Sequence, residues 1–291
     1  MENDNGIQND DNDQSVSEPD SESEFGSGND SMDIVFWCQD LCEDITNDPA
    51  EVYRILCTPE DEFSDVDWDK VFAFLRQCNA LQSIDLQGCE LPEDITSIVL
   101  GSEGPLKNSP IEELDFDFTE CERNMEALLS FVRSKATLRS IHVSGTNLRT
   151  DDAALLLDAL NDSRVIKLDI RTDNIGDEAV EDLLSAPFSK LLVRLTLFGR
   201  GTGRRTADAI CQFLRCGETM LEEFYLCPND GVRIVFENAQ MIMQSLSDNS
   251  RLKAIYVSVG ATDENSYLEV AQSLVCDQSS FDSMCQSNHQ L

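Results

Sequence analysis

The sequence is short of positive charge, of histidine and of long apolar runs. Its 291 residues contain 21 Lys and Arg against 56 Asp and Glu, which gives a net charge of −35. A field of that sign repels phosphate groups, so we expect neither a nucleic acid nor a membrane as a partner. No window reaches the roughly 18 consecutive apolar residues of a membrane span. No stretch near the first residue joins positive charge to an apolar run, as a secretory signal peptide does.

The scarcity of histidine argues against catalysis. Only His142 and His289 are present, and no spacing places either of them with a serine or cysteine nucleophile and an aspartate. His142 falls in the middle of a predicted strand, at a position that points to solvent, and we interpret it as an ordinary surface histidine. We therefore predict that the protein is not an enzyme.

The 11 cysteines show no metal-binding pattern. The pairs Cys38-x3-Cys42 and Cys211-x4-Cys216 lack the second pair, or the histidines, that complete a zinc site. We interpret them as reduced structural thiols, which places the protein inside a cell. The expected location is the cytoplasm, with the nucleus as the alternative, and we expect no cofactor and no metal.

The negative charge is concentrated toward the N-terminus. Residues 1–69 hold 22 acidic residues and one basic residue, Arg54. Within them, residues 1–33 consist mainly of acidic residues, Asn, Ser and Gly. Such a segment cannot bury enough apolar area to offset its conformational entropy. We predict a disordered acidic arm over residues 1–33.

From residue 81 onward the sequence repeats one pattern. The template is L-x-x-L-x-L-x-x-(N/C/T)-x-L followed by an amphipathic helix, and its first copy holds Leu81, Ile84, Leu86 and Leu91. One strand and one helix are too small to bury their own apolar faces, so successive units must stack and bury them together. Seven copies begin 27 to 31 residues apart, at Leu81, Ile111, Leu138, Val165, Leu192, Leu221 and Leu252.

The repeat resembles the leucine-rich repeat family, and a period with a full helix in each unit is similar to its ribonuclease-inhibitor-like subclass. The resemblance covers residues 81–275, and the best local match is Asn174–Leu184. It implies an α/β fold: a right-handed solenoid, or horseshoe, of about seven strand–helix repeats with a parallel sheet on the concave face. The family's inward-pointing Asn matches only at Asn229, while Arg200 and Gly260 stand in its place in two repeats, where we expect irregular turns.

The residues on either side of the repeats follow other patterns. Segments 34–58 and 66–78 look helical from their apolar residues. We predict an N-terminal helical cap over residues 34–80, because the end of a solenoid needs a polar outer surface. Residues 276–291 carry no repeat, and we predict a flexible tail there.

The strand positions between the leucines should face the open side of the sheet, because side chains alternate along a strand. The fifth positions of the repeats then form one column, which contains Asp85, Asp115, His142, Asp169, Thr196, Tyr225 and Tyr256. Exposed aromatic rings near arginines are typical of protein interfaces. We predict three groups of partner-binding residues: acidic Asp85, Glu113, Asp115 and Asp117; basic Lys167, Arg171 and Arg194; and aromatic Phe198, Tyr225 and Tyr256.

One loop invites a comparison with phosphate-binding loops. The stretch Leu195–Arg205 follows a predicted strand, precedes a predicted helix and contains three glycines and three arginines. It departs from the pattern G-x-G-x-x-G at the third glycine, where Arg204 stands. We interpret it as a loop of the repeat, with contact to a partner or to an acidic group as the alternative.

These features favour a non-enzymatic protein–protein interaction module that binds a protein partner on the concave face of the solenoid. One alternative is an acidic, charge-driven binder or chaperone of basic proteins, in which the arm and the acidic strand residues would bind. A second alternative is a regulatory or adaptor subunit, either a regulator of a small GTPase or a substrate adaptor of a ubiquitin ligase. We expect a monomer in each case.

Overall fold

The computed structural model describes nine segments of the chain, all within one compact unit, Asp33–Leu291. The predicted arm, the predicted tail and the positions of Arg200, Asn229 and Gly260 lie outside these segments. The described residues are 34–37, 49–56, 67–86, 93–117, 125–145, 150–172, 176–199, 203–228 and 234–257.

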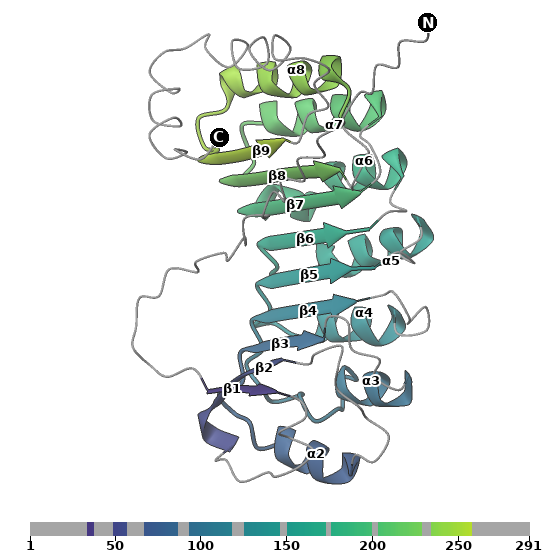
Figure 1. The fold of residues 1–291 in the computed structure, drawn as a ribbon, viewed down its shortest axis with the longest axis vertical. Helices are drawn as coiled ribbons and strands as arrows, with labels where there is room; N and C mark the ends of the chain where they lie inside the picture. The colour runs from purple at the N-terminus through teal and green to yellow at the C-terminus, as the bar shows by residue number, and fades with distance from the viewer. Residues whose placement is uncertain are drawn as a thin grey trace, which may run out of the picture. The chain divides into compact units, whose positions relative to one another are not determined.

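The described strands form one parallel sheet whose order follows the sequence from β1 to β9 (Figure 1). Each strand is hydrogen-bonded to the next one along the chain, and every such pair is parallel. The strands are β1 Ile34–Trp37, β2 Val52–Leu56, β3 Ser83–Leu86, β4 Glu113–Asp117, β5 Ser140–Ser144, β6 Lys167–Arg171, β7 Arg194–Gly199, β8 Glu223–Pro228 and β9 Ala254–Val257.

Helices supply the crossovers that parallel strands require. From β2 onward one α-helix follows each strand up to β8, and Figure 1 shows α3 to α8 on the same side of the sheet. This alternation confirms the predicted α/β class, while the right-handed sense and the concave curvature stay predictions. The helices are α2 Trp68–Leu75, α3 Glu93–Val99, α4 Met125–Ser134, α5 Thr150–Asn161, α6 Asp177–Ser185, α7 Arg204–Arg215 and α8 Phe236–Gln244, with short 3-10 helices η1 Pro49–Glu51, η3 Pro187–Leu191 and η4 Ser245–Asp248.

The repeated apolar residues form the core between sheet and helices. Six of the seven residues that begin the predicted repeats are at most 2% exposed, and the seventh, Leu252, is partly buried against them. The helices add one buried row of their own, including Leu128, Leu156, Leu183 and Ile210. Because burying each such side chain contributes about 1.5–3 kcal/mol, the stacked rows can stabilise units that could not fold alone.

The segment 34–58 is not the helix that the sequence predicted, because β1 and β2 lie there instead. Ile, Val, Phe, Trp and Tyr dominate both strands, and these residues favour a pleated sheet over a helix. In the register of β2 with β3, Ile55 lies opposite Ile84, so the repeat pattern continues upstream of residue 81. Within the predicted cap, the helix expected over 66–78 is present as α2.

A buried lysine ties two neighbouring repeats together. Lys135 follows α4, is 6% exposed, and its Nζ donates to the carbonyl oxygens of Leu106, Lys107 and Ser109. The same ammonium lies 5.4 Å from the centre of the Phe131 ring. Burial lowers the pKa of Lys135 to about 8. These three bonds hold the turn that leads into β4, which carries part of the predicted acidic surface.

Candidate protein-binding face of the sheet

The open face of the sheet is the side opposite α3 to α8. Strand pairing places the fifth repeat positions in the predicted column, from Asp85 on β3 to Tyr256 on β9. The third positions form a second column that includes Glu113, Lys167 and Arg194. A third column brings Arg171 beside Phe198. The columns therefore agree with the register that the sequence predicted.

Acidic side chains gather on β3 and β4. Asp85, Glu113 and Asp115 form what we call the acidic patch; Asp117 ends β4, but its side chain lies outside the described part. Burial, followed by the neighbouring charge of Asp85, raises the pKa of Asp115 to about 7, although Arg54 opposes this shift. The acidic patch thus holds like charges close together, and positive charge nearby would relieve their repulsion.

His142 is not the ordinary surface histidine that the sequence suggested. Its side chain is only 15% exposed and lies between two carboxylates. Nδ1 is 3.8 Å from Oδ1 of Asp115, and Nε2 is 3.8 Å from Oδ1 of Asp169. These distances suit ion pairs of a protonated imidazole but are too long for hydrogen bonds. Stacking of the column causes this burial, because the neighbours on both adjacent strands shield the ring.

The basic and aromatic residues come together on β6, β7 and β8. The guanidinium carbon of Arg171 lies 4.6 Å from the centre of the Phe198 ring, and that of Arg194 lies 4.9 Å from the centre of the Tyr225 ring. Such stacking contributes about 0.5–1 kcal/mol at exposed sites. Lys167 is exposed beside Arg194. We call these five residues the cation–aromatic patch.

Two acidic residues that the sequence did not single out orient these arginines. Arg171 donates from Nε and Nη2 to the two carboxylate oxygens of Asp169, each at 3.2 Å. Arg194 Nε lies 3.6 Å from Glu223 Oε2, and the Tyr225 hydroxyl donates to the same oxygen over 3.5 Å. In the sequence, the only sign of these contacts was that acidic and basic residues alternate within the columns. The direction of each side chain and its distance from the arginine depend on packing, which the sequence does not show.

The aromatic column ends in a contrast of exposure. Tyr256 on β9 is 53% exposed, whereas Thr196, two strands earlier in the same column, is 3% exposed. Among the described residues no group accepts or donates a hydrogen bond to Oγ1 of Thr196. The exposed ring of Tyr256 lies on β9, opposite Tyr225 on β8.

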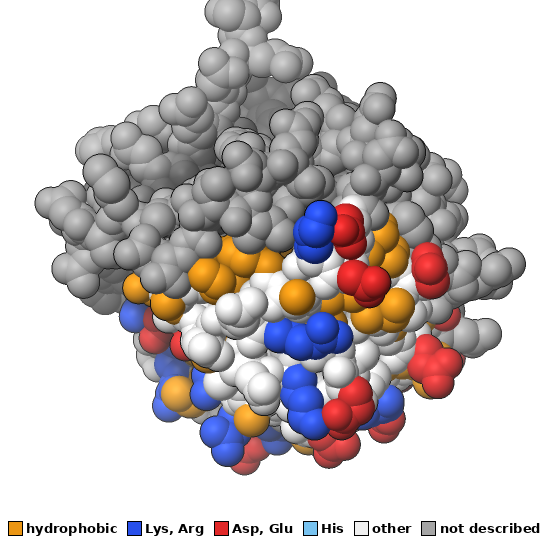
Figure 2. Space-filling model, turned by 90° about the horizontal axis from the view of Figure 1, so that it is seen from below, with side chains coloured by type: hydrophobic (Ala, Val, Ile, Leu, Met, Phe, Trp, Pro, Cys, Tyr) orange, Lys and Arg blue, Asp and Glu red, His pale blue; other side chains and the backbone are white. Residues whose placement is uncertain are grey.

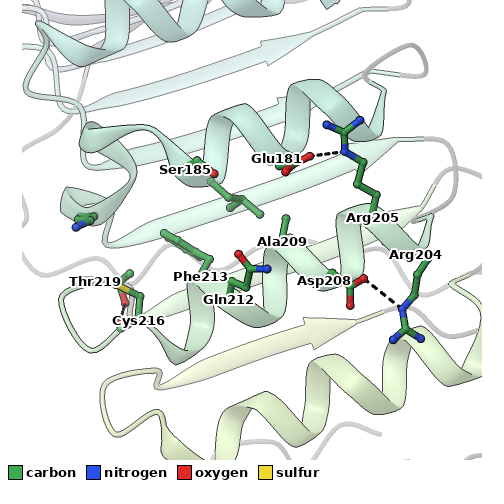
Figure 3. Close-up of a pocket in the computed structure, with 12 residues that line it drawn as sticks. Glu181, Ser185, Arg204, Arg205, Asp208, Ala209, Gln212, Phe213, Cys216 and Thr219 are labelled. Atoms are coloured by element: carbon green, nitrogen blue, oxygen red, sulfur yellow. Dashed lines mark hydrogen bonds and ion pairs between the residues drawn. The ribbon is translucent and has the colours of Figure 1, made fainter.

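A cleft of about 540 Å³ lies on the helix side, between α6 and α7 (Figure 3). Its charged side chains pair within the chain: Arg205 with Glu181, and Arg204 with Asp208 at 3.3 Å. Lys190, at one end, is 2.5 Å from Glu218. The arginines of the glycine-containing loop that the structure describes are therefore already engaged by carboxylates.

The N-terminus of α7 also receives a carboxylate of this chain. Thr206 Oγ1 donates to Oδ1 of Asp177 at 2.6 Å. A Cβ atom on Gly203 would collide with the same carboxylate, so glycine permits the close approach. A negative group at this position satisfies the positive end of the helix dipole. The Asp177 carboxylate therefore occupies the position at the start of α7 where a phosphate-binding loop would hold a phosphate.

Among the described residues, no three His, Cys, Asp or Glu side chains are grouped so as to hold a metal ion. Burial raises the pKa of the thiols of Cys78 and Cys227 to about 11 and also raises that of Cys211, which makes thiolates scarce. None of the helices in these segments has the length and apolar character to cross a bilayer.

The open face differs from other parts of the surface in how its charges are arranged. Figure 2 shows one end of the molecule, where Lys and Arg side chains are interspersed with Asp and Glu over the described residues. On the open face, acidic residues gather on β3 and β4, and Lys167, Arg171 and Arg194 gather on β6 and β7, where Asp169 is paired with Arg171. This separation of sign makes the open face the candidate site.

No family model matches the sequence, and no curated protein matches it either. Solved structures do match part of the fold, including the following two. The tropomodulin C-terminal domain from Caenorhabditis elegans has 10% sequence identity and a TM-score of 0.34, with 68% of this chain and 100% of that chain covered. A chain of the yeast Rad7 and Elc1 complex has 12% identity and a TM-score of 0.47, with 80% of this chain and 67% of that chain covered. The assignment of this chain to the α/β strand–helix repeat fold therefore rests on its own strand pairing.

Proposed function

We propose that the protein is a non-enzymatic interaction module that binds a protein partner on the open face of its sheet. One observation carries the proposal: two arginines on this face each lie over an aromatic ring of the adjacent strand, Arg171 over Phe198 and Arg194 over Tyr225. Arginine and tyrosine are enriched among the residues that contribute most to binding at interfaces. Exposed Tyr256 extends the same surface by one strand.

The parallel sheet prepares this surface for binding. Each strand from β3 to β8 is hydrogen-bonded to a neighbouring strand on both sides, which holds the residues of the column in place. A surface that is ordered before binding loses less conformational entropy when the partner arrives. The charges that line the helix-side cleft are, by contrast, paired with one another, which makes that cleft the weaker candidate.

The test is capture of partners by a variant with Tyr225→Ala and Tyr256→Ala. We expect proteins captured from a cell lysate by the unaltered chain to be lost, because both rings leave the surface. The matched control is Leu155→Ala with Leu191→Ala, which removes apolar groups that are 49% and 55% exposed on helices. Both variants should melt within a few degrees of the unaltered chain. An identical set of captured proteins for the two variants contradicts binding through the open face.

A second candidate is a charge-driven binder or chaperone of basic proteins, which the acidic patch and the net charge of −35 favour. Affinity for a basic protein such as a histone should then fall steeply with salt. Deleting residues 1–33 should flatten that dependence, because the deletion removes 11 acidic residues and no basic ones. A slope unchanged by the deletion assigns no role to the arm.

The finer features that we predicted belong to the same proposal. We propose that the open face is the concave side of a right-handed solenoid and that the chain is a monomer of the cytoplasm or nucleus. A regulator of a small GTPase or an adaptor of a ubiquitin ligase is a special case of such a module. The identity of the captured protein distinguishes these cases, and light scattering after gel filtration measures the oligomeric state.

A further inference from the structure

We infer that the open face takes a segment of a partner protein that is itself bipolar. A cationic side chain of this segment lies over the acidic patch on β3 and β4, and an anionic side chain lies over the cation–aromatic patch on β6 and β7. The inference rests on the proposed function, which it makes specific by stating the chemistry of the partner.

The acidic patch can accept a cation because its own charges repel one another. Asp85 and Asp115 face each other across neighbouring strands, and Glu113 lies in the adjacent column. Arg54 acts on Asp115, yet burial and, after it, the charge of Asp85 keep the pKa of Asp115 raised to about 7. An arginine or lysine from a partner would stabilise the ionised carboxylates and complete the neutralisation that Arg54 begins.

The cation–aromatic patch can accept an anion because its guanidinium groups are held in place. Two bonds to Asp169 use two of the five N–H groups of Arg171, so three remain when only the described residues are considered. Arg194 lies beyond hydrogen-bonding distance of Glu223, at 3.6 Å. The guanidinium carbons of Arg171 and Arg194 lie 4.6 Å and 4.9 Å from the centres of the Phe198 and Tyr225 rings, which restricts their movement, and a guanidinium held in place suits a carboxylate well.

The spacing of the two patches sets the spacing of charges in the partner. Three strand steps separate β4 from β7, and at about 4.8 Å per step the patches lie about 14 Å apart. Between them β5 presents Ser140, His142 and Ser144, which add no second acidic or basic cluster. In an extended segment, at about 3.3 Å per residue, opposite charges about four residues apart match this distance.

Two synthetic peptides of equal composition and zero net charge test the inference. In the first, two arginines and two glutamates stand at opposite ends of three Gly and Ser residues, so that the nearest opposite charges are four residues apart, and it is made in both chain orders. In the second, the same residues alternate in sign. Because both are neutral, the overall charge of the protein attracts neither one preferentially. We expect the separated peptide, in at least one order, to bind the full chain about tenfold more tightly in fluorescence anisotropy at low salt.

Charge exchange on the protein supplies the decisive comparison. Lys167→Glu with Arg194→Glu, or Asp85→Lys with Glu113→Lys, should remove the tenfold preference. All four changes together leave the net charge at its original value and exchange the positions of the two charges, so the preference should return. Thermal melts of each variant check that the fold persists.

The outcomes separate this inference from the proposed function. Equal binding of both peptides, lost on Tyr225→Ala with Tyr256→Ala, overturns the bipolar partner and leaves the open face as the binding surface. Equal binding that no change on the face alters overturns both. No binding of the separated peptide up to millimolar concentration overturns the bipolar partner, and the capture experiment then decides on the face alone.

Discussion

The two ends of the open face treat charge differently. On β3 and β4, carboxylates lie close together, and the pKa of Asp115 rises to about 7. On β6 to β8, each arginine lies on an aromatic ring and beside one carboxylate. On β3 and β4, burial and neighbouring carboxylates disfavour ionisation, and positive charge from a partner would relieve this effect. On β6 to β8, each arginine is already held by a ring and a carboxylate of this chain. The same repeated backbone thus supports an acidic patch whose charge depends on pH and a cation–aromatic patch whose side chains are held in place before a partner binds.

The largest expected effect is on the free energy of unfolding, and it shows whether the cores under the two ends are equally stable. Leu114→Ala under the acidic patch and Phe224→Ala under the cation–aromatic patch should each destabilise the protein by about 3–5 kcal/mol, because both side chains are 0% exposed. Urea unfolding followed by circular dichroism measures the free energy. As a control, Leu191→Ala should change it by less than about 0.5 kcal/mol. A loss near zero for either core variant would show that the two ends differ in their cores as well.

The pH dependence of stability should distinguish the acidic end. Burial and the charge of Asp85 raise the pKa of folded Asp115 to about 7, above the ordinary value of an aspartate, so the folded state holds this proton more tightly than the unfolded state. The resulting stability is complete below about pH 4 and is lost as the pH rises through 7. Asp115→Asn should remove about 2 kcal/mol of this dependence, a figure that allows for water around the quarter of the side chain that is exposed.

The control for that measurement is Asp158→Asn, which removes an exposed carboxylate beside Arg133 on the helix side. Its curve of unfolding free energy against pH should run parallel to that of the unaltered chain between pH 4 and 8. If the Asp115→Asn curve also runs parallel to that of the unaltered chain, Asp115 does not have the raised pKa on which the difference between the two ends depends.

The smallest effect concerns the stacking at the other end. A double-mutant cycle of Arg171→Met and Phe198→Leu should give a coupling of about 0.5–1 kcal/mol in urea unfolding, because each change alone removes the cation–ring contact. The matched cycle is Arg133→Met with Asp158→Asn, an exposed ion pair, where about 0.3–0.5 kcal/mol is expected. A coupling of zero between Arg171 and Phe198 would mean that the arginine is not held by the ring.

Much of the fold could be predicted from the repeats, and the exceptions have physical causes. Seven copies with fixed apolar spacing predicted the strands β3 to β9 and the register between them. The strands β1 and β2 were missed because their apolar residues are too few to show a period by themselves. Ile55 is recognisable as a repeat position only when it lies opposite Ile84 in the sheet.

The sequence predicted which residues share the open face, but not the contacts between them. The sequence placed Arg194 and Tyr225 on neighbouring strands, but not the 4.9 Å approach of the guanidinium to the ring. It correctly predicted that His142 lies in the central column, but the prediction that its side chain is exposed to solvent was wrong. It offered no sign that Asp177 would reach the start of α7, because that contact joins residues 29 positions apart through side-chain packing.

The period, the buried rows and the columns of the open face follow from the order of the amino acids alone. They do so because alternation along a strand and a repeat of 27 to 31 residues decide which residues share a face and a row. The effects of neighbouring side chains in a row on one another's burial, pKa and contacts depend on the tertiary structure. The burial of His142, the raised pKa of Asp115 and the stacking of Arg171 on Phe198 all depend on the approach of side chains from adjacent strands. A linear pattern contains no information about those distances.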